Sequence, residues 1–512
     1  MEKRFSIYFT LWFFAFILIV SNIWGISIFS LDEAKNASCA REMLERGDLI
    51  VPTFNYELRT DKPPLHYYFM MIAYKIFGIN EFSARFFSSL FGSFTVLITF
   101  FFAKRVFDEK VAFLGYLILL SSLHFVFQFH MAVPDPFLIF FLTAAIFSFY
   151  TFYNEGKNLF LWLFYICIGF GILSKGLVAL VLPSFTILVF LVLRKDLVFL
   201  KSMNVLKGLF IITLISLPWY IAVGLKTDWV WVKEFLLKHN ISRFSDSMEG
   251  HGGIFLITFL FVFVGMLPFS VFLPQTVKEI IKNRTNSTVL FLSLFVFIYT
   301  LFFSISKTKL PNYTVVVYPS LAVLIGFTLV KLRNYRYFYS LIFYFILTLI
   351  LPIALYFSLK NDSNLYLVAR YSFFFFILTI GAVLSLIFYK DVKKVIISLS
   401  LSSILMTLVF FFVLMPRVDK ESSVKIILPY IDKNLPIGYY KRYNPAFSFY
   451  LKKKIVKLES PKDVEEFIKQ GKVNILTREE FLEELKDIKN LKVIVKKKDL
   501  FENPTSVLLK NF

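Results

Sequence analysis

Long apolar runs alternate with short polar loops along most of the chain. A helix needs about twenty residues to cross about 30 Å of hydrocarbon at about 1.5 Å per residue, and most of these runs have that length. The pattern therefore predicts an α-helical polytopic membrane protein with about 13 transmembrane helices. The first run is too long for a signal peptide and no cleavage site precedes Asp32, so we expect a retained first helix. The spans are predicted near residues 7–30, 83–103, 111–130, 134–152, 159–174, 176–193, 207–224, 254–274, 289–306, 312–330, 337–358, 371–389 and 394–415.

Two stretches interrupt this pattern. The first covers residues 31–85 and gathers carboxylates and cations, which avoid a large cost of burial when they lie outside the hydrocarbon. We interpret it as an outside loop that forms the floor of an active site. The second begins near Arg417, where the charge rises. These changes predict a transmembrane domain at residues 1–416 with its catalytic first outside loop at 31–85, and a small soluble extracytoplasmic α/β domain at 417–512.

The tail alternates strand-like and helix-like segments. Ser460-Pro461 is typical of a helix start, with an N-cap followed by a first-turn proline, and Gly471 is typical of a helix end. Thr477 and Glu480 have the spacing of a capping box. No catalytic constellation is visible here, which favours a cap or a binding module. Extended segments are predicted at residues 439–451, 455–458, 473–476, 491–495 and 506–509.

Composition and charge decide the class of protein and its orientation. The chain is 57% hydrophobic and 19% aromatic, with a formal net charge of +21. In a soluble protein this charge would raise nucleic-acid binding, but here the cations lie in short loops and in the tail, which is typical of anchoring against anionic lipid. About nineteen Lys and Arg fall on the N-terminal side of the membrane and about nine in the short loops opposite. The positive-inside rule therefore predicts a multi-pass protein of the cytoplasmic (inner) membrane, with residues 31–85 and the C-terminus outside.

Charged residues recur at the predicted outside ends of the spans. Asp135, in Val133-Pro134-Asp135-Pro136, is either an N-cap of the next helix or a second acidic group that faces the first loop. Lys175, in Ser174-Lys175-Gly176, either snorkels to the interface or contacts a phosphate, and the glycine permits close backbone approach.

Two later loops on the same predicted side add candidates. The loop at residues 224–253 carries two histidines and an arginine. The stretch at residues 303–313 places two lysines and a tyrosine between apolar spans, and cations at a membrane rim are functional candidates by default. The candidates in these two loops are Arg243, His251, Lys307, Lys309 and Tyr313.

The predicted outside face thus combines carboxylates with cations. Carboxylates can act as general bases or hold a metal, and cations can hold a phosphate. Together they suit transfer of a group from a phosphorylated lipid, whose leaving group is an anion. The acidic candidates are Asp32, Glu33, Asp61 and Asp135, and the basic candidates are Lys62, Lys175, Arg243, Lys307 and Lys309.

The motifs resemble those of the bacterial GT-C glycosyltransferases, relatives of the protein O-mannosyltransferases and of the aminoarabinose transferase that modifies lipid A. The resemblance covers the membrane part and, more loosely, the tail. The matching motifs are Asp32-Glu33, Ala40-Arg41-Glu42-Met43, Gly47-Asp48, Asp61-Lys62-Pro63-Pro64-Leu65, Phe77-Gly78 with Glu81 and Arg85, Leu173-Ser174-Lys175-Gly176, Leu217-Pro218-Trp219-Tyr220, His239 to Phe244 with His251, and Phe303-Ser304 through Lys309-Leu310-Pro311 to Pro319.

This resemblance implies a role for each candidate. The carboxylates are expected at the reacting centre, with Asp32 as the key group. Lys62 is expected near the donor phosphate. The implied catalytic residues are Asp32, Glu33 and Asp135, and the implied phosphate-binding residues are Lys62, Lys175, Arg243, Lys307, Lys309 and Tyr313.

The aminoarabinose branch also implies a metal. There, an acidic residue before Lys-Pro-Pro and a later histidine bind zinc, and the matching positions are Asp61 and His251. A divalent metal, zinc or magnesium, is therefore a candidate cofactor. This chain departs from that branch in carrying Asp61 in place of Glu and Lys35-Asn36 in place of Arg-Tyr.

The predicted function is transfer of a sugar, a hexose or a pentose, from a polyprenyl-phosphate donor to a lipid or protein acceptor. The expected partners are this donor, the acceptor and membrane lipids, with no nucleic acid. If the acceptor is a hydroxyl, Asp32 is the candidate general base; if it is an ionised phosphate, Asp32 positions substrate or metal. The alternative is a membrane transporter or a flippase of lipid-linked substrates, which should carry midplane charges or an inverted repeat, and no such repeat is visible in the sequence.

Overall fold

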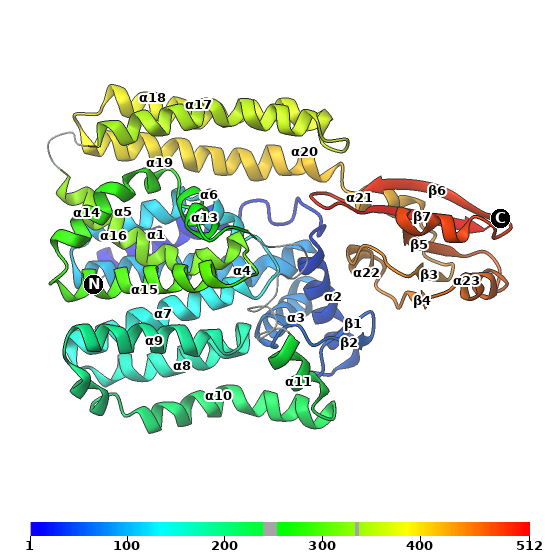
Figure 1. Cartoon of the computed structure of the whole chain (residues 1–512), viewed down its shortest axis with the longest axis horizontal. Helices are drawn as coiled ribbons and strands as arrows, with labels where there is room; N and C mark the ends of the chain where they lie inside the picture. Colours follow the sequence, from blue (N-terminus) through cyan, green and yellow to red (C-terminus); the bar gives the residue numbers. More distant parts are fainter. Residues whose placement is uncertain (1, 239–252, 333–336, 512) are drawn as a thin grey trace.

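The computed structural model describes residues 2–238, 253–332 and 337–511. Long helices run alongside one another, and a small sheet domain formed by the tail lies beyond one end of them (Figure 1). Two further helices, α2 (Leu31–Arg46) and α3 (Leu65–Phe77), lie between the long helices and the sheet domain. We call this end of the helical part the site face.

The helices of the membrane part match the predicted apolar pattern. Within the described ranges, nine helices are long and apolar enough to span a membrane, or ten if one bent pair counts as a span. The predicted fold class is confirmed, but the count of thirteen is not, because helices such as α1 and α9 fall short of a full span. The main helices are α1 (Glu2–Ile19), α4 (Glu81–Val106), α5 (Glu109–Ser121), α6 (Leu123–Gln128), α7 (Asp135–Glu155), α8 (Asn158–Lys175), α9 (Val178–Leu193), α10 (Val205–Lys226), α13 (Ile257–Gly265), α14 (Leu273–Lys282), α15 (Ser287–Ile305), α16 (Tyr318–Lys331), α17 (Phe338–Lys360), α18 (Phe376–Ile387) and α19 (Val392–Val409).

Short helical pieces connect these helices. They occur where the chain turns at the membrane rim or continues a longer helix. The described pieces are η1 (Leu197–Lys201), α11 (Val230–Leu236), η3 (Phe269–Phe272), η4 (Pro311–Val317), η5 (Tyr366–Phe375), the π-helical η6 (Phe410–Leu414), α20 (Met415–Asp419), α21 (Ser423–Ile427) and η7 (Leu428–Tyr430).

The first span, predicted at residues 7–30, ends early because the chain turns around a buried arginine. Asn22 takes a left-handed backbone conformation with φ 58°, which breaks the helix. The following carbonyls then point at Arg85: Nη1 donates to the oxygens of Ile23 and Ile26 at 2.9 and 2.6 Å, and Nη2 donates to that of Ser27 at 3.1 Å. These bonds satisfy backbone groups that the interrupted helix leaves open.

Residues 31–85 are mostly helical, whereas the sequence suggested a loop. Helix α2 ends at Gly47, whose φ of 63° is a left-handed conformation that glycine adopts without strain. A hairpin of β1 (Thr53–Phe54) and β2 (Glu57–Leu58) follows. Helix α4 then starts at a capping box in which Asn80 and Ser83 bond each other's backbone N–H groups. The predicted catalytic loop is therefore a layer of two helices joined by a hairpin.

The tail forms a five-stranded sheet in the order β4-β3-β5-β7-β6. Strand β3 is parallel to β4 and β5, and β7 is antiparallel to β5 and β6. A helix capped by Ser460 and Asp463 packs beside it as the sequence suggested. The elements are β3 (Ile437–Tyr440), α22 (Ala446–Leu451), β4 (Val456–Leu458), α23 (Pro461–Ile468), β5 (Asn474–Arg478), η8 (Glu479–Leu485), β6 (Leu491–Lys498) and β7 (Thr505–Asn511).

Two details of the tail differ from the prediction. The segment expected to be extended at residues 439–451 ends in helix α22. The predicted capping box at Thr477 is wrong, because Thr477 lies inside β5 and its hydroxyl donates to the carbonyl of Tyr440 at 3.1 Å. The short helix η8 starts only after Arg478.

One hydrophobic cluster joins the two-helix layer to the sheet domain. It contains Ala37 and Ala40 of α2, Met70 of α3, and Phe447 and Leu508 of the sheet domain. Small alanine side chains let α22 approach α2 closely, and burial of this apolar area favours the contact. The sheet domain is therefore packed on the elements that carry the candidate residues.

Candidate functional site

The start of α2 and the loop before α3 bring two predicted carboxylates to one arginine. Asp32 lies in the first turn of α2, where the helix N-terminus favours a negative charge. Buried Arg59 places Nη2 3.5 Å from Asp32 Oδ1 and Nε 3.3 Å from Asp61 Oδ2. Two residues 29 positions apart in the sequence are thus held beside a shared cation.

Lys62 is buried without a counter-ion in the described part of the chain. It is 7% exposed, and it makes no hydrogen bond or ion pair with any residue that the structure describes. Pro63 and Pro64 follow it, and their fixed φ angles stiffen the connection to α3. Burying an ammonium group is costly unless an anion compensates it. This lysine is therefore placed to meet an anion that the described residues do not supply.

His66, in the first turn of α3, is also buried without a partner among the described residues. Its side chain is fully buried, and neither ring nitrogen has a hydrogen-bond partner among the described residues. Burial lowers the pKa of His66 well below its usual value, and the nearby charges of Arg59 and Lys62 lower it further. The imidazole is therefore neutral at pH 7. Two guanidinium nitrogens of Arg59 also lack hydrogen bonds here.

A second charged cluster lies at the start of α7. The Nζ atom of Lys175, at the end of α8, is 2.5 Å from Asp135 Oδ1, and Asn312 Nδ2 donates to the same oxygen at 3.0 Å. The Lys175 ammonium also lies over the ring of Tyr313 of η4, 4.6 Å from its centroid. The consecutive helices α7 and α8 and the distant η4 thus meet at Asp135.

This geometry decides between the two interpretations of Asp135. The residue is the first of α7, Pro134 precedes it, and no side-chain cap is present. The N-cap interpretation is therefore wrong. Asp135 instead holds Lys175 at the end of α8, so this lysine does not simply extend toward the lipid headgroups.

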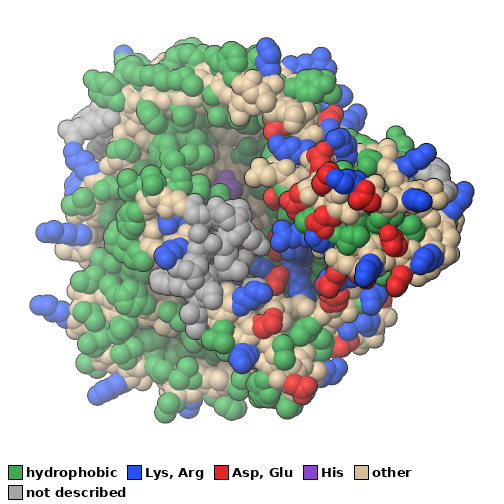
Figure 2. Space-filling view, turned by 45° about the vertical axis from the view of Figure 1, so that its right-hand side comes forward, with side chains coloured by type: hydrophobic (Ala, Val, Ile, Leu, Met, Phe, Trp, Pro, Cys, Tyr) green, Lys and Arg blue, Asp and Glu red, His purple; other side chains and the backbone are tan. Residues whose placement is uncertain are grey.

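The two clusters lie on neighbouring helices of the site face. Phe69 of α3 stacks on Phe137 of α7 with ring centroids 5.2 Å apart, so the first turns of these helices run close together. Figure 2 turns this face forward: hydrophobic side chains cover the helices, and charged side chains gather over the sheet domain and the adjoining rim. Convergence of all candidates on one cavity stays a prediction, because Arg243, His251 and His239 lie outside the described residues.

Glu33 is engaged in a buried structural network. Its two oxygens accept hydrogen bonds from Arg85 Nε and Nη2 at 2.7 and 2.8 Å, and one of them also accepts the N–H of Ala132 at 2.9 Å. Both side chains of this ion pair are almost fully buried. Because the carboxylate is saturated by α4 and by the chain before α7, we interpret Glu33 as structural in place of the catalytic role implied by its motif.

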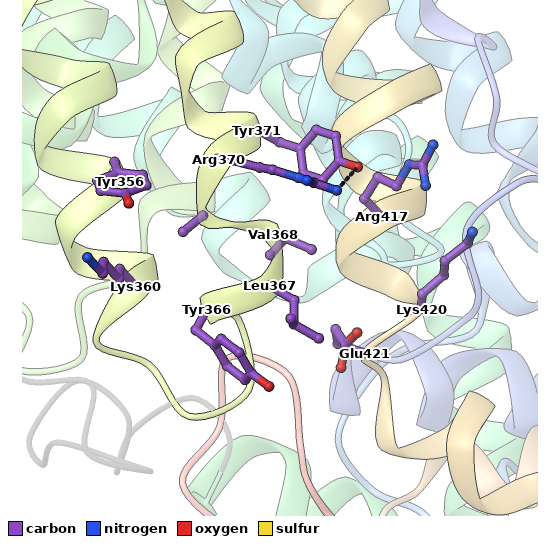
Figure 3. Close-up of a pocket in the computed structure, with 11 residues that line it drawn as sticks. Tyr356, Lys360, Tyr366, Leu367, Val368, Arg370, Tyr371, Arg417, Lys420 and Glu421 are labelled. Carbon is purple, nitrogen blue, oxygen red and sulfur yellow. Dashed lines mark hydrogen bonds between the residues drawn. The ribbon is translucent and has the colours of Figure 1, made fainter.

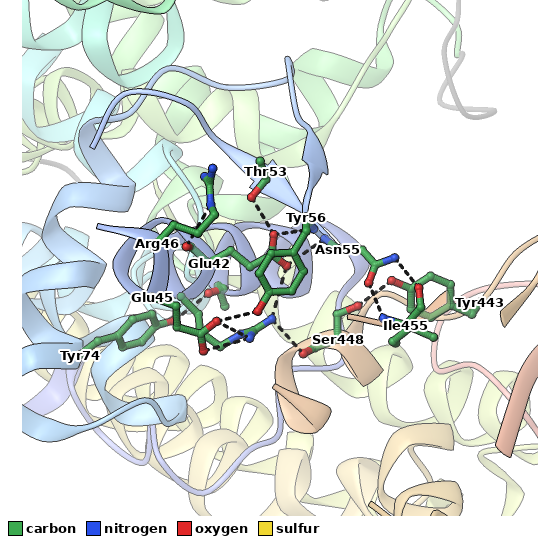
Figure 4. A network of polar contacts seen from close by, with 12 residues as sticks. Glu42, Glu45, Arg46, Thr53, Asn55, Tyr56, Tyr74, Tyr443, Ser448 and Ile455 are labelled. Carbon is green, nitrogen blue, oxygen red and sulfur yellow. Dashed lines mark hydrogen bonds and ion pairs between the residues drawn. The ribbon is translucent and has the colours of Figure 1, made fainter. Parts of the chain in front are cut away.

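Glu42 forms a second saturated network, which ties α2 to the hairpin (Figure 4). One carboxylate oxygen accepts the Thr53 hydroxyl at 2.8 Å and the N–H of Tyr56 at 2.9 Å, and the other accepts the N–H of Asn55 at 2.8 Å. Asn55 in turn exchanges two 2.9 Å hydrogen bonds with the backbone of Ile455 in the sheet domain. Burial raises the pKa of Glu42, and these hydrogen bonds lower it in part.

The later basic stretch contributes one buried and one exposed cation. Lys309 is buried, and its Nζ donates to the carbonyl of Ser306 at 2.6 Å. Lys307 is exposed. Both follow α15 and precede η4, which carries Asn312 and Tyr313 beside the second cluster. The described contacts therefore place this stretch next to Asp135 and Lys175.

The described residues do not form a metal site. Among them, no group of three or more His, Cys, Asp or Glu side chains is placed to hold a metal ion. The candidate ligand Asp61 faces the guanidinium of Arg59, a cation that competes with a metal for its oxygens. The other candidate, His251, is outside the described ranges.

Three residues that the sequence did not single out belong to these clusters. Arg59 and His66 flank the Asp61-Lys62 motif by two and four positions, so their proximity in the chain was a usable signal. Asn312 lies 177 positions from Asp135, and an asparagine in a loop carries no comparable signal.

Comparison with known proteins agrees with this arrangement. The family described as dolichyl-phosphate-mannose-protein mannosyltransferase matches residues 61–221. An uncharacterized protein of Aquifex aeolicus (strain VF5) is 32% identical over 344 residues, which cover 67% of this chain and 77% of that protein. The undecaprenyl phosphate-alpha-4-amino-4-deoxy-L-arabinose arabinosyl transferase of Enterobacter sp. (strain 638) is 33% identical over 58% of this chain, and the match spans 54% of its length.

A solved structure shares the whole fold. The crystal structure of ArnT from Cupriavidus metallidurans bound to undecaprenyl phosphate has a TM-score of 0.84 at 19% sequence identity, covering 98% of this chain and 96% of that one. The predicted resemblance is confirmed by these matches together. The chain is a GT-C type membrane glycosyltransferase that resembles the aminoarabinose transferases and the protein mannosyltransferases.

Proposed function

We propose that this multi-pass membrane glycosyltransferase transfers a sugar from a polyprenyl-phosphate donor to a lipid or protein acceptor. The observation that carries the proposal is Lys62, which is only 7% exposed and has no counter-ion among the described residues; its charge, like that of Asp32, acts on the buried His66. A lipid phosphate would supply the missing charge. The relatives support this chemistry, since two of them are named for lipid-linked sugars and one was solved with undecaprenyl phosphate.

The proposed reaction is a displacement at the anomeric carbon of the donor. The bond from this carbon to the phosphate oxygen breaks, its electron pair stays on the phosphate, and a new bond forms to the acceptor oxygen. Negative charge grows on the leaving phosphate, so a fixed cation stabilises the transition state more than the bound donor. Lys62 supplies this cation, and Lys175, held by Asp135 and Tyr313, supplies a second.

Asp32 has one of two roles, depending on the acceptor. A hydroxyl acceptor loses a proton as it attacks, and Asp32 then takes that proton as general base. A phosphate acceptor is already ionised and needs no base, so Asp32 then positions substrate through the Arg59 pair. Arg243, Lys307, Lys309 and His251 remain proposals for the rim of the same site. The division of the chain at residues 416 and 417 also stays a prediction.

Transfer in proteoliposomes tests the function directly. Purified protein receives a polyprenyl phosphate carrying a labelled sugar, in parallel with one pentose and one hexose, because the relatives' names support both. The expected result is label on the acceptor and release of the unglycosylated polyprenyl phosphate. Movement of labelled donor across the bilayer without any transfer would favour the flippase alternative and refute the proposal.

We further propose that the site face is extracytoplasmic in the cytoplasmic membrane, as the charge asymmetry of the loops supports. Single cysteines at two exposed positions test this orientation: Lys489→Cys in the sheet domain and Lys282→Cys at the end of α14. The native Cys39 and Cys167 are both buried, so they give little background. An impermeant reagent added to intact cells should label position 489 alone. Labelling of 282 alone would reverse the topology.

A further inference from the structure

A basic pocket lies on the site face, away from the clusters described above. It has a volume of about 650 Å³ and lies between the end of α17, the helix η5 and the helix α20 (Figure 3). No residue of the two clusters lines this pocket. Asp32 belongs to α2, Lys62 to the loop before α3, Asp135 to α7 and Lys175 to α8. Its charged lining residues are Lys360, Arg370, Arg417, Lys420 and Glu421.

The positive charge of this pocket is not neutralised by the protein. Glu421 is already paired, since its carboxylate lies 2.7 Å from Lys497 Nζ. None of the four cations has a carboxylate partner within the described part of the chain. The guanidinium groups of Arg370 and Arg417 lie 5.2 and 5.5 Å from the ring centroid of Tyr371, and Arg370 Nη2 also donates to the Tyr371 hydroxyl at 3.4 Å. Guanidinium groups bind phosphate well, so two of them around one ring suit an anionic phosphate.

Exposed phenylalanines adjoin the lining of the pocket: Phe373 stacks on the lining residue Tyr356 with ring centroids 5.1 Å apart, and Phe357 follows Tyr356 in the chain. Phe357 at the end of α17 is 58% exposed, and Phe373 and Phe374 of η5 are 44% and 40% exposed. These helices are candidate membrane spans, and only 28% and 33% of their apolar windows are buried inside the protein. Exposed phenylalanines on a membrane-spanning helix face lipid chains. The pocket therefore opens where the apolar surface meets the charged end of the helices.

We propose that this pocket binds the anionic phosphate headgroup of a membrane lipid in the leaflet on the site-face side. The headgroup would contact the cations of the pocket, Arg370 and Arg417 among them, and the acyl chains would run along Phe357, Phe373 and Phe374. The four cations lie on the side opposite the basic cytoplasmic loops, which departs from the positive-inside pattern. Binding of an anionic ligand accounts for their presence on this side. This site does not depend on the proposed sugar transfer.

The pocket is also mechanically linked to the sheet domain. Asn364, in the turn between α17 and η5, donates to the carbonyl of Lys498 at 2.6 Å. The Glu421–Lys497 pair makes a second connection from α20 to strand β6. A lipid held between η5 and α20 would therefore stabilise the two membrane elements that the sheet domain contacts.

Native mass spectrometry of the full-length protein tests the proposal. The protein is purified in detergent, given equal amounts of phosphatidylglycerol and phosphatidylcholine, and the retained lipids are counted. We expect retention of the anionic lipid over the zwitterionic one. In Arg370→Gln/Arg417→Gln this preference should fall about tenfold, because two charge contacts to the headgroup are lost. The conservative pair Arg370→Lys/Arg417→Lys should keep most of it.

A matched control separates this site from general charge attraction. Arg194→Gln/Arg284→Gln removes two exposed arginines at the opposite ends of the helices and should leave the preference unchanged. The thermal midpoint in lipid-free detergent should be the same for all variants. Equal lipid preference in the wild type and in the Arg370/Arg417 double glutamine variant would overturn the proposal. Displacement of the lipid by excess inorganic phosphate would also overturn it, by assigning the pocket to a soluble phosphate.

Discussion

The polar groups near the two ends of helix α2 differ in whether the fold supplies their hydrogen-bond and ion-pair partners. Near its C-terminal end, the Glu42 carboxylate accepts three hydrogen bonds from the hairpin, and Asn55 extends the network to the sheet domain. Near its N-terminal end, Asp32 meets Arg59, and beside this pair lie Lys62 without a counter-ion and His66 with both ring nitrogens unpartnered among the described residues. The buried Glu42 carboxylate receives all its partners from the fold, whereas Asp32 is 49% exposed and the buried groups beside it lack partners among the described residues.

This difference separates a structural polar network from a binding site. An unsatisfied buried polar group costs about 1–3 kcal/mol, and a charge costs more, so a fold keeps such groups only where something compensates them. The Glu42 network is compensated internally and holds α2 to its neighbours. The Lys62 and His66 region would be completed by a ligand, and its positive character selects an anion.

Replacement of Asp32 should give the largest effect when the acceptor is a hydroxyl. Asp32→Asn keeps the shape of the side chain but cannot take a proton, and general-base catalysis contributes about 10²–10⁴ in rate. Turnover in the proteoliposome assay should fall by that factor with a hydroxyl acceptor. With a phosphate acceptor the loss should be small. An unchanged rate with a hydroxyl acceptor would remove the general-base role.

The layer between the long helices and the sheet domain shows how far the sequence could predict this site. Hydropathy located most of the membrane segments, since their apolar windows are continuous, and the motif at Asp61-Lys62 lies in the layer that carries the first candidate cluster. The capping pattern at Ser460 was also correctly interpreted, because capping involves only residues three positions apart.

Contacts over long separations were not predictable from the sequence. Glu33 pairs with Arg85, which is 52 positions away in the sequence. Asp135 accepts a hydrogen bond from Asn312, at a separation of 177 positions. Glu33 and Asp32 are adjacent acidic residues, and only the fold shows that one is saturated by an arginine while the other faces the candidate site. Residues 31–85 were interpreted as a loop because α2 is polar, but the sheet domain and the long helices bury it from two sides.

Removal of Lys62 should be the next largest effect. Lys62→Ala takes away a cation beside the leaving phosphate, and loss of one such preorganised group costs about 10²–10³ in rate. Stability should not fall, because this lysine has no partner among the described residues. Turnover and the thermal midpoint are measured on the same preparation. Lys110→Ala, an exposed lysine at the opposite ends of the helices, is the control and should leave turnover unchanged. Full turnover in Lys62→Ala would contradict the phosphate contact.

Disruption of the Glu42 network should lower stability while sparing chemistry. Glu42→Gln puts an amide donor among the hydroxyl and N–H groups that now donate to the carboxylate, and the unsatisfied groups should cost about 1–3 kcal/mol of unfolding free energy. The thermal midpoint should fall, and transfer at low temperature should stay within a few-fold of the wild type. Glu45→Gln, which alters the half-exposed partner of Arg41, should change the midpoint little. A larger midpoint loss for Glu45→Gln would show that the saturated network is misassigned.

The smallest effect concerns His66 and appears only at acid pH. Burial lowers the pKa of His66 in the folded protein, so below the ordinary histidine pKa of about 6.5 the unfolded chain binds a proton that the folded protein does not. Stability should therefore decrease as pH falls from about 6.5, with a slope of up to about 1.4 kcal/mol per pH unit from this residue. His66→Gln removes the proton site and should flatten the fall of the thermal midpoint between about pH 6.5 and 5.5. If the thermal midpoint of the wild type instead rises on acidification relative to this variant, His66 is charged in the folded protein. The difference between the two ends of α2 would then not hold for this residue.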